Sequence, residues 1–452
     1  MKWIGKYRVL GLLGRGGFGR IYKVIRPELG RLMALKLLKP EELQETLWGL
    51  DELKRQFWQE ARIMGGLDHD NIASVLDVGE FEGRPFMVLE YYCLNLGLLI
   101  GEGYRLEEPS RTLVPGKALG YAEQALHGLG SLHHAGIVHR DVKPYNFMLS
   151  RSDHIRLIDF GLSKVRGELP PQRPRSAIIG SPYYSAPEQE SQPDQVDARA
   201  DLYGLGVLLY RLLTGRLPQQ GLQELQAPPF QADAWAEFFS TALAEQPGDR
   251  FRDAWQMLSG VKELQECWQE ARDAACKLPN DGLVEKSNAA GERPRSRPIR
   301  SGPVKRIPFP GLTPLAQPAL SRRSSFTRRE KGILEDAANG LEWLMDAPPL
   351  PMSWQEAGEL VASLNRELGG EEAAWRVPTV EELLTLLQPR FRPEDLCLPP
   401  ILGGQRRRLW SSDERTCSAA WLVDAENGAV LWQDKACRFR ILPVRVRKVS
   451  DG

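Results

Sequence analysis

The stretch HRDVKPYN, residues 139–146, decides how the whole chain is interpreted. Eighteen residues after its aspartate, Asp141, comes the triplet DFG at 159–161, and the triplet APE follows at 186–188. Each triplet alone would arise by chance in many proteins. All three in this order, downstream of a glycine-rich turn and of a strand that ends in lysine, indicate one catalytic arrangement.

The glycine-rich turn is GRGGFGRI, residues 14–21, which fits the pattern G-x-G-x-x-G-x-V with isoleucine in the last place. Glycines let the backbone approach phosphate oxygens, because no Cβ stands in the way. The turn lies between two strand patterns and not before a helix, which disfavours a dinucleotide-binding fold. Seventeen residues after Gly19, a strand ends in Lys36, a candidate cation for nucleotide phosphates. Glu60 on a predicted helix is the expected partner of this lysine, and Glu52 on the same helix is the alternative.

The chain from residue 7 to about 262 resembles the eukaryotic-type (bacterial Hanks-type) serine/threonine protein kinase family on these motifs. The resemblance implies a bilobal α+β fold in a domain of residues 1–270, with a β-rich N-lobe over 1–92 and an α-helical C-lobe over 93–270. The residues favour the same division, because strand patterns dominate before residue 92 and helical patterns follow it. One helix is expected among the strands, with apolar residues at helical spacing at Leu53, Phe57, Ala61 and Met64.

The resemblance also implies roles for individual residues. In this family a hydroxyl group attacks the terminal phosphate of ATP in line, and the enzyme neutralises the charge on the transferring group. Asp141 would accept or orient the hydroxyl proton, with Lys143 near the γ-phosphate and Lys36 on the α- and β-phosphates. Asn146 and Asp159 are hard oxygen ligands suited to Mg²⁺, or to Mn²⁺ in its place. The expected ATP-binding residues are Gly14, Arg15, Gly16, Gly17, Phe18, Gly19, Ile21, Lys36, Glu60, Glu90 and Tyr92, of which Glu90 and Tyr92 would meet adenine through their backbones.

The catalytic and platform segments resemble serine/threonine kinases in particular. Lys143 stands two residues past Asp141, and GSPYYSAPE at 180–188 matches the family's G-T-x-x-Y-x-A-P-E with serine for threonine. Ser181 is expected to bond toward both catalytic residues and to complete a substrate platform. Ser176 is the preferred site of activation-loop phosphorylation.

Three further residues are expected to hold the site. Arg250 stands where the family places the cation that pairs with Glu188, and Asp201 would anchor the backbone of the catalytic loop. Two stretches depart from the family pattern. Only Asn95 is available past the hinge for the ribose hydroxyls, and residues 101–110 form an insertion that we expect to be a surface loop.

The C-terminal part of the chain changes in composition. Residues 271–337 are rich in proline, serine and arginine and predict a disordered linker, in which Ser324 and Ser325 follow two arginines and are hypothetical autophosphorylation sites. Residues 338–449 contain several tryptophans, with the motif WRVPTVEEL and a later WSS. This region resembles the small α+β, C-type-lectin-like domain at the C-terminus of collagen-like bacterial adhesins. We expect a recognition module with an unknown ligand, whose tryptophans are mostly core.

Composition bounds the function. The chain has 452 residues, enough for two to three domains, and 59 basic residues balance 59 acidic ones, which disfavours a dedicated nucleic-acid binder. No apolar run approaches the ~20 residues of a membrane span, so a cytoplasmic location is expected.

The sequence therefore predicts a serine/threonine protein kinase of bacterial signalling that uses ATP and Mg²⁺, phosphorylates proteins including itself, and carries a C-terminal sensing or docking domain. One alternative is a catalytically dead scaffold whose C-terminal domain does the binding. Another makes the C-terminal domain the functional centre, with the kinase as its regulator. Small-molecule kinases share part of the pattern but generally lack the APE platform.

Overall fold

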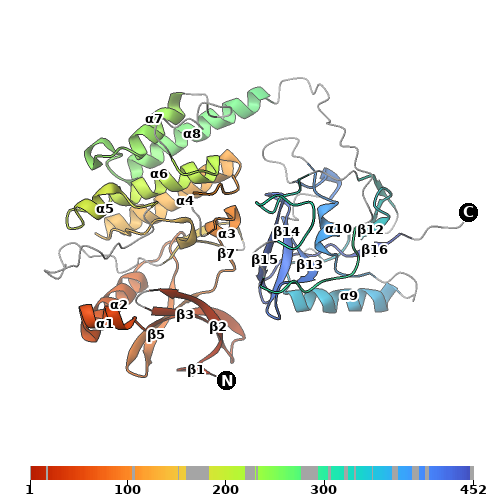
Figure 1. Ribbon diagram of the computed structural model, residues 1–452, viewed down its shortest axis with the longest axis horizontal. Helices are drawn as coiled ribbons and strands as arrows, with labels where there is room; N and C mark the ends of the chain where they lie inside the picture. The colour runs from red at the N-terminus through yellow and green to blue at the C-terminus, as the bar shows by residue number, and fades with distance from the viewer. Residues whose placement is uncertain are drawn as a thin grey trace, which may run out of the picture. The chain divides into compact units, whose positions relative to one another are not determined.

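The computed structural model describes residues 2–16, 19–103, 107–150, 152–158, 183–218, 230, 233–275, 294–303, 307–319, 324–329, 332–348, 350–368, 375–388, 397–402 and 407–447. The chain forms two compact units, residues 1–278 and 279–452, which Figure 1 colours from red to green and from teal to blue. Within the described ranges, no helix is both long and apolar enough to cross a bilayer.

The first unit begins with a six-stranded antiparallel sheet in the order β1-β2-β3-β4-β6-β5. Its strands are β1 (Trp3–Ile4), β2 (Tyr7–Gly16), β3 (Gly19–Arg26), β4 (Arg31–Leu38), β5 (Val75–Phe81) and β6 (Arg84–Glu90). Alternation along β4 turns Met33, Leu35 and Leu37 into the core and leaves Lys36 on the opposite face. This alternation positions the lysine of the candidate site.

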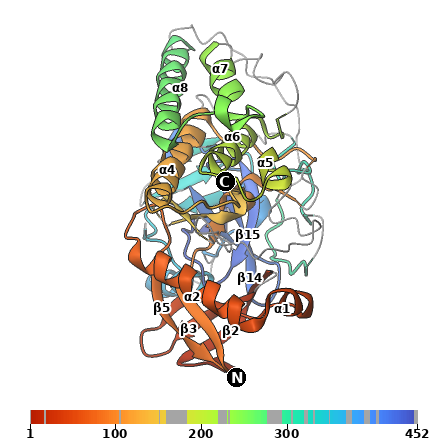
Figure 2. The same ribbon diagram turned by 90° about the vertical axis from the view of Figure 1, so that its left-hand side faces the viewer.

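Two helices interrupt the strands, α1 (Glu42–Trp48) and α2 (Leu50–Gly66). The buried residues of α2 include the four that the periodicity indicated, which are Leu53, Phe57, Ala61 and Met64. The predicted amphipathic helix is confirmed as α2, whereas α1 is a second helix where only one was expected. Figure 2 shows α2 lying across the strands of the sheet.

A helical lobe follows, and both Figure 1 and Figure 2 place it at the opposite end of this unit from the six-stranded sheet. Its elements are β7 (Leu94–Asn95), α3 (Leu96–Ile100), α4 (Pro115–His134), η1 (Pro144–Asn146), β8 (Phe147–Leu149), β9 (Ile155–Leu157), α5 (Pro187–Ser191), α6 (Arg199–Thr214), α7 (Asp233–Ala242), η3 (Pro247–Asp249) and α8 (Ala254–Ala275). Helix α6 is buried along almost its whole length, as its apolar sequence predicts. The bilobal α+β prediction is confirmed.

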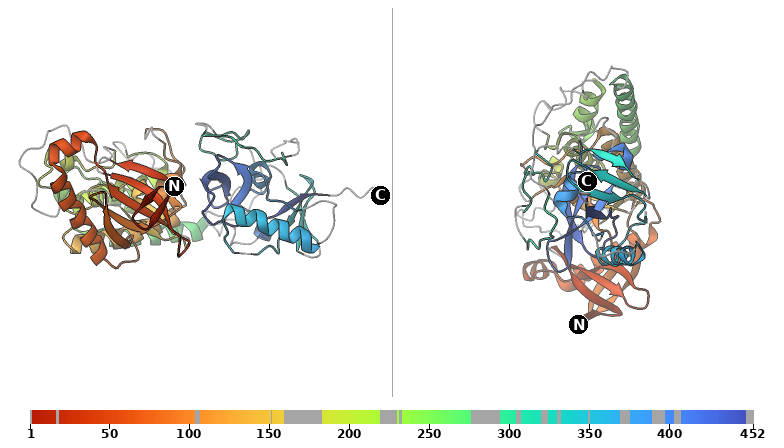
Figure 3. Two further views of the ribbon diagram at one scale, coloured as in Figure 1. Left: turned by 90° about the horizontal axis from the view of Figure 1, so that it is seen from below. Right: turned by 90° about the vertical axis from the view of Figure 1, so that its right-hand side faces the viewer.

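The second unit contains two small antiparallel sheets, with the orders β10-β11-β12-β16 and β13-β14-β15. Its elements are β10 (Phe326–Arg328), β11 (Ile333–Asp336), β12 (Leu341–Leu344), α9 (Trp354–Leu368), α10 (Val380–Leu384), η4 (Pro400–Leu402), β13 (Arg408–Glu414), β14 (Ala419–Asp424), β15 (Ala429–Asp434) and β16 (Val444–Val446). Helix α9 lies at the outside of this unit in both panels of Figure 3.

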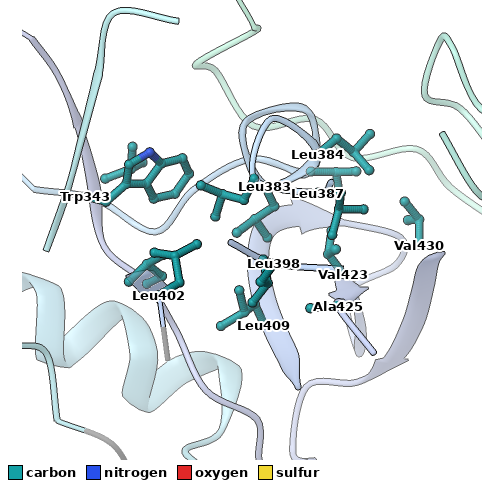
Figure 4. Close-up of a cluster of buried hydrophobic side chains, with 14 of the residues drawn as sticks. Trp343, Leu383, Leu384, Leu387, Leu398, Leu402, Leu409, Val423, Ala425 and Val430 are labelled. Carbon is teal, nitrogen blue, oxygen red and sulfur yellow. The ribbon is translucent and has the colours of Figure 1, made fainter. Parts of the chain in front are cut away.

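Leucines, valines and tryptophans fill the core of the second unit. Figure 4 shows Trp343 at one end of a cluster that leucines of α10 and strand residues such as Val423 complete. Trp375, Trp410 and Trp421 are also buried, whereas Trp432 keeps 38% of its surface exposed. The expectation that the tryptophans are mostly core is confirmed for Trp343, Trp375, Trp410 and Trp421.

The structure corrects the expected linker at residues 271–337 for the described residues between 294 and 337. The second unit begins at Pro279, and Phe309 packs its ring 5.3 Å from the ring of Trp421 in the core. The hydroxyl of Ser324 donates to the carbonyl of Thr385 at 2.5 Å, and the backbone N–H of Ser325 donates to Asp336. Both serines therefore belong to a folded unit, so a disordered acceptor segment is the wrong description of them.

Candidate functional site

Lys36 and Glu60 form an ion pair at the base of the six-stranded sheet. The Nζ of Lys36 lies 2.9 Å from Oε1 of Glu60, and the two side chains are 15% and 6% exposed. Strand β4 supplies the lysine, and α2 supplies the glutamate from the row of residues that it buries. Glu52, the alternative partner, instead accepts from Arg55 at 2.8 Å. The structure thus decides between the two carboxylates that the sequence left open.

The glycine-rich turn connects β2 to β3, and the described strands pair up to Gly16 and Gly19 at its two ends. A Cβ on Gly19 would lie 2.6 Å from the carbonyl oxygen of Leu37 on β4, so glycine is required there by the close approach of the neighbouring strand. Ile21 is the β3 residue directly opposite Lys36 on β4. The turn and the lysine are therefore parts of one continuous ladder.

Residues 139–146, here called the HRD loop, present Asp141 with two polar neighbours. Its Oδ2 accepts from Nζ of Lys143 at 2.6 Å and from Nδ2 of Asn146 at 3.0 Å. The Asn146 amide nitrogen also donates to the carbonyl of Asp141 at 2.7 Å. The aspartate keeps 20% of its side-chain surface exposed, so a group from outside can reach it.

A buried carboxylate holds the backbone of this loop in place. Asp201, at the start of α6, accepts from the N–H of His139 at 2.8 Å and from the N–H of Arg140 at 2.7 Å, and His133 Nε2 lies 2.8 Å away. Arg140 has a φ of 65°, a left-handed conformation that a non-glycine residue adopts only when its surroundings hold it there. The predicted anchoring role of Asp201 agrees with this geometry.

The charge of Asp201 is matched to its surroundings. Burial alone would raise the pKa of this carboxyl group. The hydrogen bond and charge of His133, the charge of His139 and the N–H of Arg140 outweigh that effect and hold the pKa of Asp201 below its ordinary value. The group therefore stays an ionised acceptor at the point where two consecutive N–H groups converge.

Residues 183–188, here called the platform segment, are tied down at their C-terminal end. Glu188 accepts from both terminal nitrogens of Arg250, at 2.7 and 2.8 Å, and the arginine side chain is fully buried. The guanidinium group also lies 4.8 Å from the centre of the Tyr203 ring. A bidentate pair of this kind fixes both position and orientation. The pairing agrees with the expectation from the family pattern.

The connection between the lobes is held by side chains. Glu90 ends β6, and its carboxylate accepts from Arg31 at 3.1 Å and from the hydroxyl of Tyr92 at 2.6 Å. The adenine contact of the Glu90 and Tyr92 backbones stays a prediction. The Oδ1 of Asn95 accepts from the N–H of Leu98 at 2.8 Å and caps α3, a structural use that differs from the ribose contact we considered for it.

Several predicted site residues lie outside the described residues. They are Gly17, Phe18, Asp159, Ser176 and Ser181. Of the two expected metal ligands, Asn146 is therefore the one whose surroundings the structure describes. Its amide nitrogen faces Asp141, and its amide oxygen is a hard ligand of the kind that magnesium takes.

Our sequence reasoning missed the role of residues 101–110, which we expected to be a surface loop. Glu102 is only 8% exposed, and its carboxylate lies beside Tyr184 of the platform segment and Arg211 of α6. One signal could have indicated it, because a lone arginine inside the apolar helix sequence LYGLGVLLYRLLTG requires a buried partner.

Comparisons with known proteins cover both units. A model of the protein kinase domain matches residues 7–264, and a model of the Lcl C-terminal domain matches residues 332–445. The second match is to the family that the tryptophan motifs indicated.

Relatives of known identity match the first unit. Serine/threonine-protein kinase Pkn1 of Myxococcus xanthus is 34% identical over 267 residues, which are 55% of this chain and 36% of that protein. PrkC of Bacillus subtilis is 29% identical over 316 residues, 64% of this chain and 46% of that protein. The kinase domain of Mycobacterium tuberculosis PknI is 27% identical, with a TM-score of 0.44 over 58% of this chain and 96% of that one. The chain spans less than half the length of the two curated relatives.

Proposed function

The chain belongs to the protein kinase family, and from this premise we propose that it transfers the γ-phosphate of ATP to serine and threonine hydroxyls of proteins, its own included. The observation that carries the proposal is the HRD loop. Asp141 is partly exposed there, in contact with Lys143 and Asn146, on a backbone that Asp201 holds.

Asp141 would orient the attacking hydroxyl and receive its proton. The hydroxyl oxygen bonds to the γ-phosphorus while the bond from that phosphorus to the bridging oxygen breaks, and ADP leaves. Lys143 lies 2.6 Å from Asp141, so an ammonium group stands where the charge of the transferring phosphate would gather. Lys36, held by Glu60, supplies the cation for the α- and β-phosphates.

Asn146 and Asp159 are the proposed ligands of a magnesium ion, or of manganese in its place. The bound ion would neutralise charge on the phosphates of ATP. This chain contributes the hard oxygens. It also holds Asn146 in register with Asp141 through two hydrogen bonds from the amide nitrogen.

The scaffold alternative, a protein with the kinase fold and no catalysis, has less support. Such proteins usually lose the lysine, the aspartates or the asparagine of the site, and all of these residues are present in this chain. The Lys36–Glu60 pair at 2.9 Å is a further argument, because a protein kinase needs this pair in place to be active.

The C-terminal unit is proposed to sense or dock a ligand or partner. Its separate core supports this, because a domain with its own core keeps its fold whatever the state of its neighbour. A ligand-binding phenotype of the isolated C-terminal unit, in a cell or in an assay, would favour the rival idea, in which this unit carries the main function.

The experiment is to incubate the full chain with γ-labelled ATP and Mg²⁺, using casein as a generic serine- and threonine-containing acceptor. The matched variants are Asp141→Asn and Asp70→Asn, the second at an exposed loop position. Label on the protein and on casein should fall at least about 100-fold for Asp141→Asn and stay unchanged for Asp70→Asn. Equal labelling by the two variants would reject the mechanism, and no labelling by the natural chain would reject the activity.

A further inference from the structure

An ion pair lies inside the helical lobe, between the inserted segment and α6. The side chains of Glu102 and Arg211 are only 2% and 1% exposed, and Nε of the arginine lies 3.9 Å from Oε2 of the glutamate. Taking two charges out of water carries a large desolvation penalty, so a buried pair is weak evidence for stability. The contacts of Glu102 indicate a different reason for its presence.

Glu102 contacts both segments that would handle a phosphate acceptor. Its Oε2 accepts from the hydroxyl of Tyr184 in the platform segment at 2.6 Å. Its backbone carbonyl accepts from the hydroxyl of Tyr145 in the HRD loop, also at 2.6 Å. Tyr145 directly precedes Asn146, a proposed metal ligand. One residue of the inserted segment therefore bridges the platform and the catalytic loop.

The backbone around Glu102 is fixed from several sides. Gly101 has a φ of 67°, and a Cβ there would lie 2.8 Å from the guanidinium group of Arg111. That buried arginine donates to the carbonyl of Leu99 at 3.0 Å. A Cβ on Gly97 would lie 2.8 Å from the Tyr145 ring, so α3 packs directly on the loop. The backbone that carries Glu102 is thus fixed in position by its neighbours.

The platform segment is held from two directions. Glu188 and Arg250 hold its C-terminal end, as described above. Glu102 holds Tyr184, which is 3% exposed, while the neighbouring Tyr183 is 41% exposed and contacts Glu107 of the same insertion. The carbonyl of Tyr184 and the side chain of Val142 both lie against Gly204 of α6. Moving Tyr184 would therefore move the surface on which an acceptor polypeptide rests.

We infer that Glu102 is a positioning residue for the polypeptide acceptor, which it serves by fixing the platform segment to the HRD loop through Tyr184. The inference rests on the proposed kinase activity and assigns a role to the insertion at residues 101–110. This role has a selective effect, because Glu102 affects only the phosphorylation of a protein hydroxyl. It leaves the binding of ATP unchanged, as well as the slow hydrolysis of ATP, in which water is the acceptor and needs no platform.

The first test is Tyr184→Phe, which removes one hydroxyl and leaves both buried charges paired. We expect kcat/KM for casein to fall about 10-fold, mainly through KM, while KM for ATP and the rate of ATP hydrolysis change less than about twofold. The matched control is Tyr121→Phe on α4. It removes another buried tyrosine, whose hydroxyl donates to Asp153 at 3.0 Å, and should leave casein phosphorylation unchanged.

The second test removes the side-chain acceptor of Glu102 without leaving a lone buried charge, by combining Glu102→Leu with Arg211→Met. The double variant should lose casein kcat/KM as Tyr184→Phe does, and adding Tyr184→Phe to it should cause no further loss. Casein phosphorylation within twofold of the natural chain in Tyr184→Phe, or ATP hydrolysis that falls in parallel with it, overturns the inference. A natural chain that labels no acceptor at all would instead refute the proposed function.

Discussion

Asp201 in the first unit and Asp413 in the second are both fully buried carboxylates that hold distant pieces of backbone. Asp201 accepts from two consecutive N–H groups of the HRD loop at 2.8 and 2.7 Å. Asp413 accepts from the N–H groups of Ile299 and Val380, likewise at 2.8 and 2.7 Å. Each also has a cationic or ionisable partner, His133 for the first and Arg295 for the second.

The two anchors differ in what the held segments carry. The loop held by Asp201 presents Asp141, whose side chain is 20% exposed beside Lys143. The segments held by Asp413 turn inward, because Ile299 packs against the core and Val380 is fully buried. A buried carboxylate therefore marks where the chain must be held, and the exposed groups on the held segment decide whether chemistry follows.

Asp201→Asn is expected to have the largest effect on activity. An amide offers a single oxygen to two N–H donors and points its own N–H groups at one of them, so the HRD loop loses a charge-assisted hydrogen bond worth about 1.5–3 kcal/mol. Labelling of casein should fall at least about 100-fold. The measurement is kcat/KM with γ-labelled ATP. Activity within a factor of three of the natural chain would contradict the role of Asp201 in holding the HRD loop for catalysis.

Asp413→Asn is the same chemical change in the second unit. It leaves Arg295 with Glu381 as its remaining carboxylate partner and removes the acceptor of one of two backbone N–H groups, so the unfolding free energy of this unit should fall by about 3 kcal/mol. Casein labelling should stay within twofold. Calorimetry of the full chain checks the first expectation, and a loss of activity comparable with that of Asp201→Asn would show that the second anchor also supports catalysis.

The anchored catalytic loop could be predicted from the sequence, and the reason is local. Lys36, Asp141 and Asn146 sit in short motifs whose spacing determines their geometry, and the apolar stripe of α2 places Glu60 on its buried face. The choice of Glu60 over Glu52 needed the structure, because both lie on one helix and only three-dimensional packing separates them.

The bridge at Glu102 could not be predicted from local patterns. Its partners Tyr145, Tyr184 and Arg211 lie 43, 82 and 109 positions along the chain, and a glutamate between glycines is typical of an exposed turn. The folded stretch before residue 332 was missed for a related reason. Composition averages over a window, whereas a few apolar residues, Phe309, Leu312 and Ala316, pack this segment against the core.

The two units should also respond differently to acid. The pKa of Asp201 is lowered, so its stabilising effect is complete above the ordinary value of about 4 and is lost only as the pH falls through the lower, folded-state value. Burial raises the pKa of Asp336 in the second unit, and hydrogen bonds from Asn339 and from the N–H of Ser325 only partly offset that. Its stabilising effect is complete below about 4 and is lost as the pH rises through the higher folded value.

Lowering the pH from 7 toward 4.5 should therefore raise the contribution of Asp336 to the stability of the second unit. The contribution of Asp201 to the stability of the first unit should stay unchanged. The measurement is the midpoint of the second unit's unfolding transition against pH. Asp336→Asn should remove part of the pH dependence, whereas Asp434→Asn, at a half-exposed strand end, should keep the natural slope. Identical slopes for the two variants would contradict the assignment.

The smallest effect is expected from removing the second unit altogether, by ending the chain after residue 278. Helix α8 is the last element of the first unit, and it must be kept because Trp268 is buried beneath Gly116 of α4 and Gln265 donates to Glu123 of the same helix at 3.0 Å. The anchor Asp201 and the buried Arg250 both have their partners within residues 1–278. Casein phosphorylation by the shortened chain should therefore stay within about twofold of the full chain.

A control that ends at residue 262, inside α8, should lose activity together with its folded structure, as circular dichroism would record. A chain ending after residue 278 that folds normally yet labels nothing would mean that the HRD loop depends on the second unit. The anchors Asp201 and Asp413 would then support catalysis together.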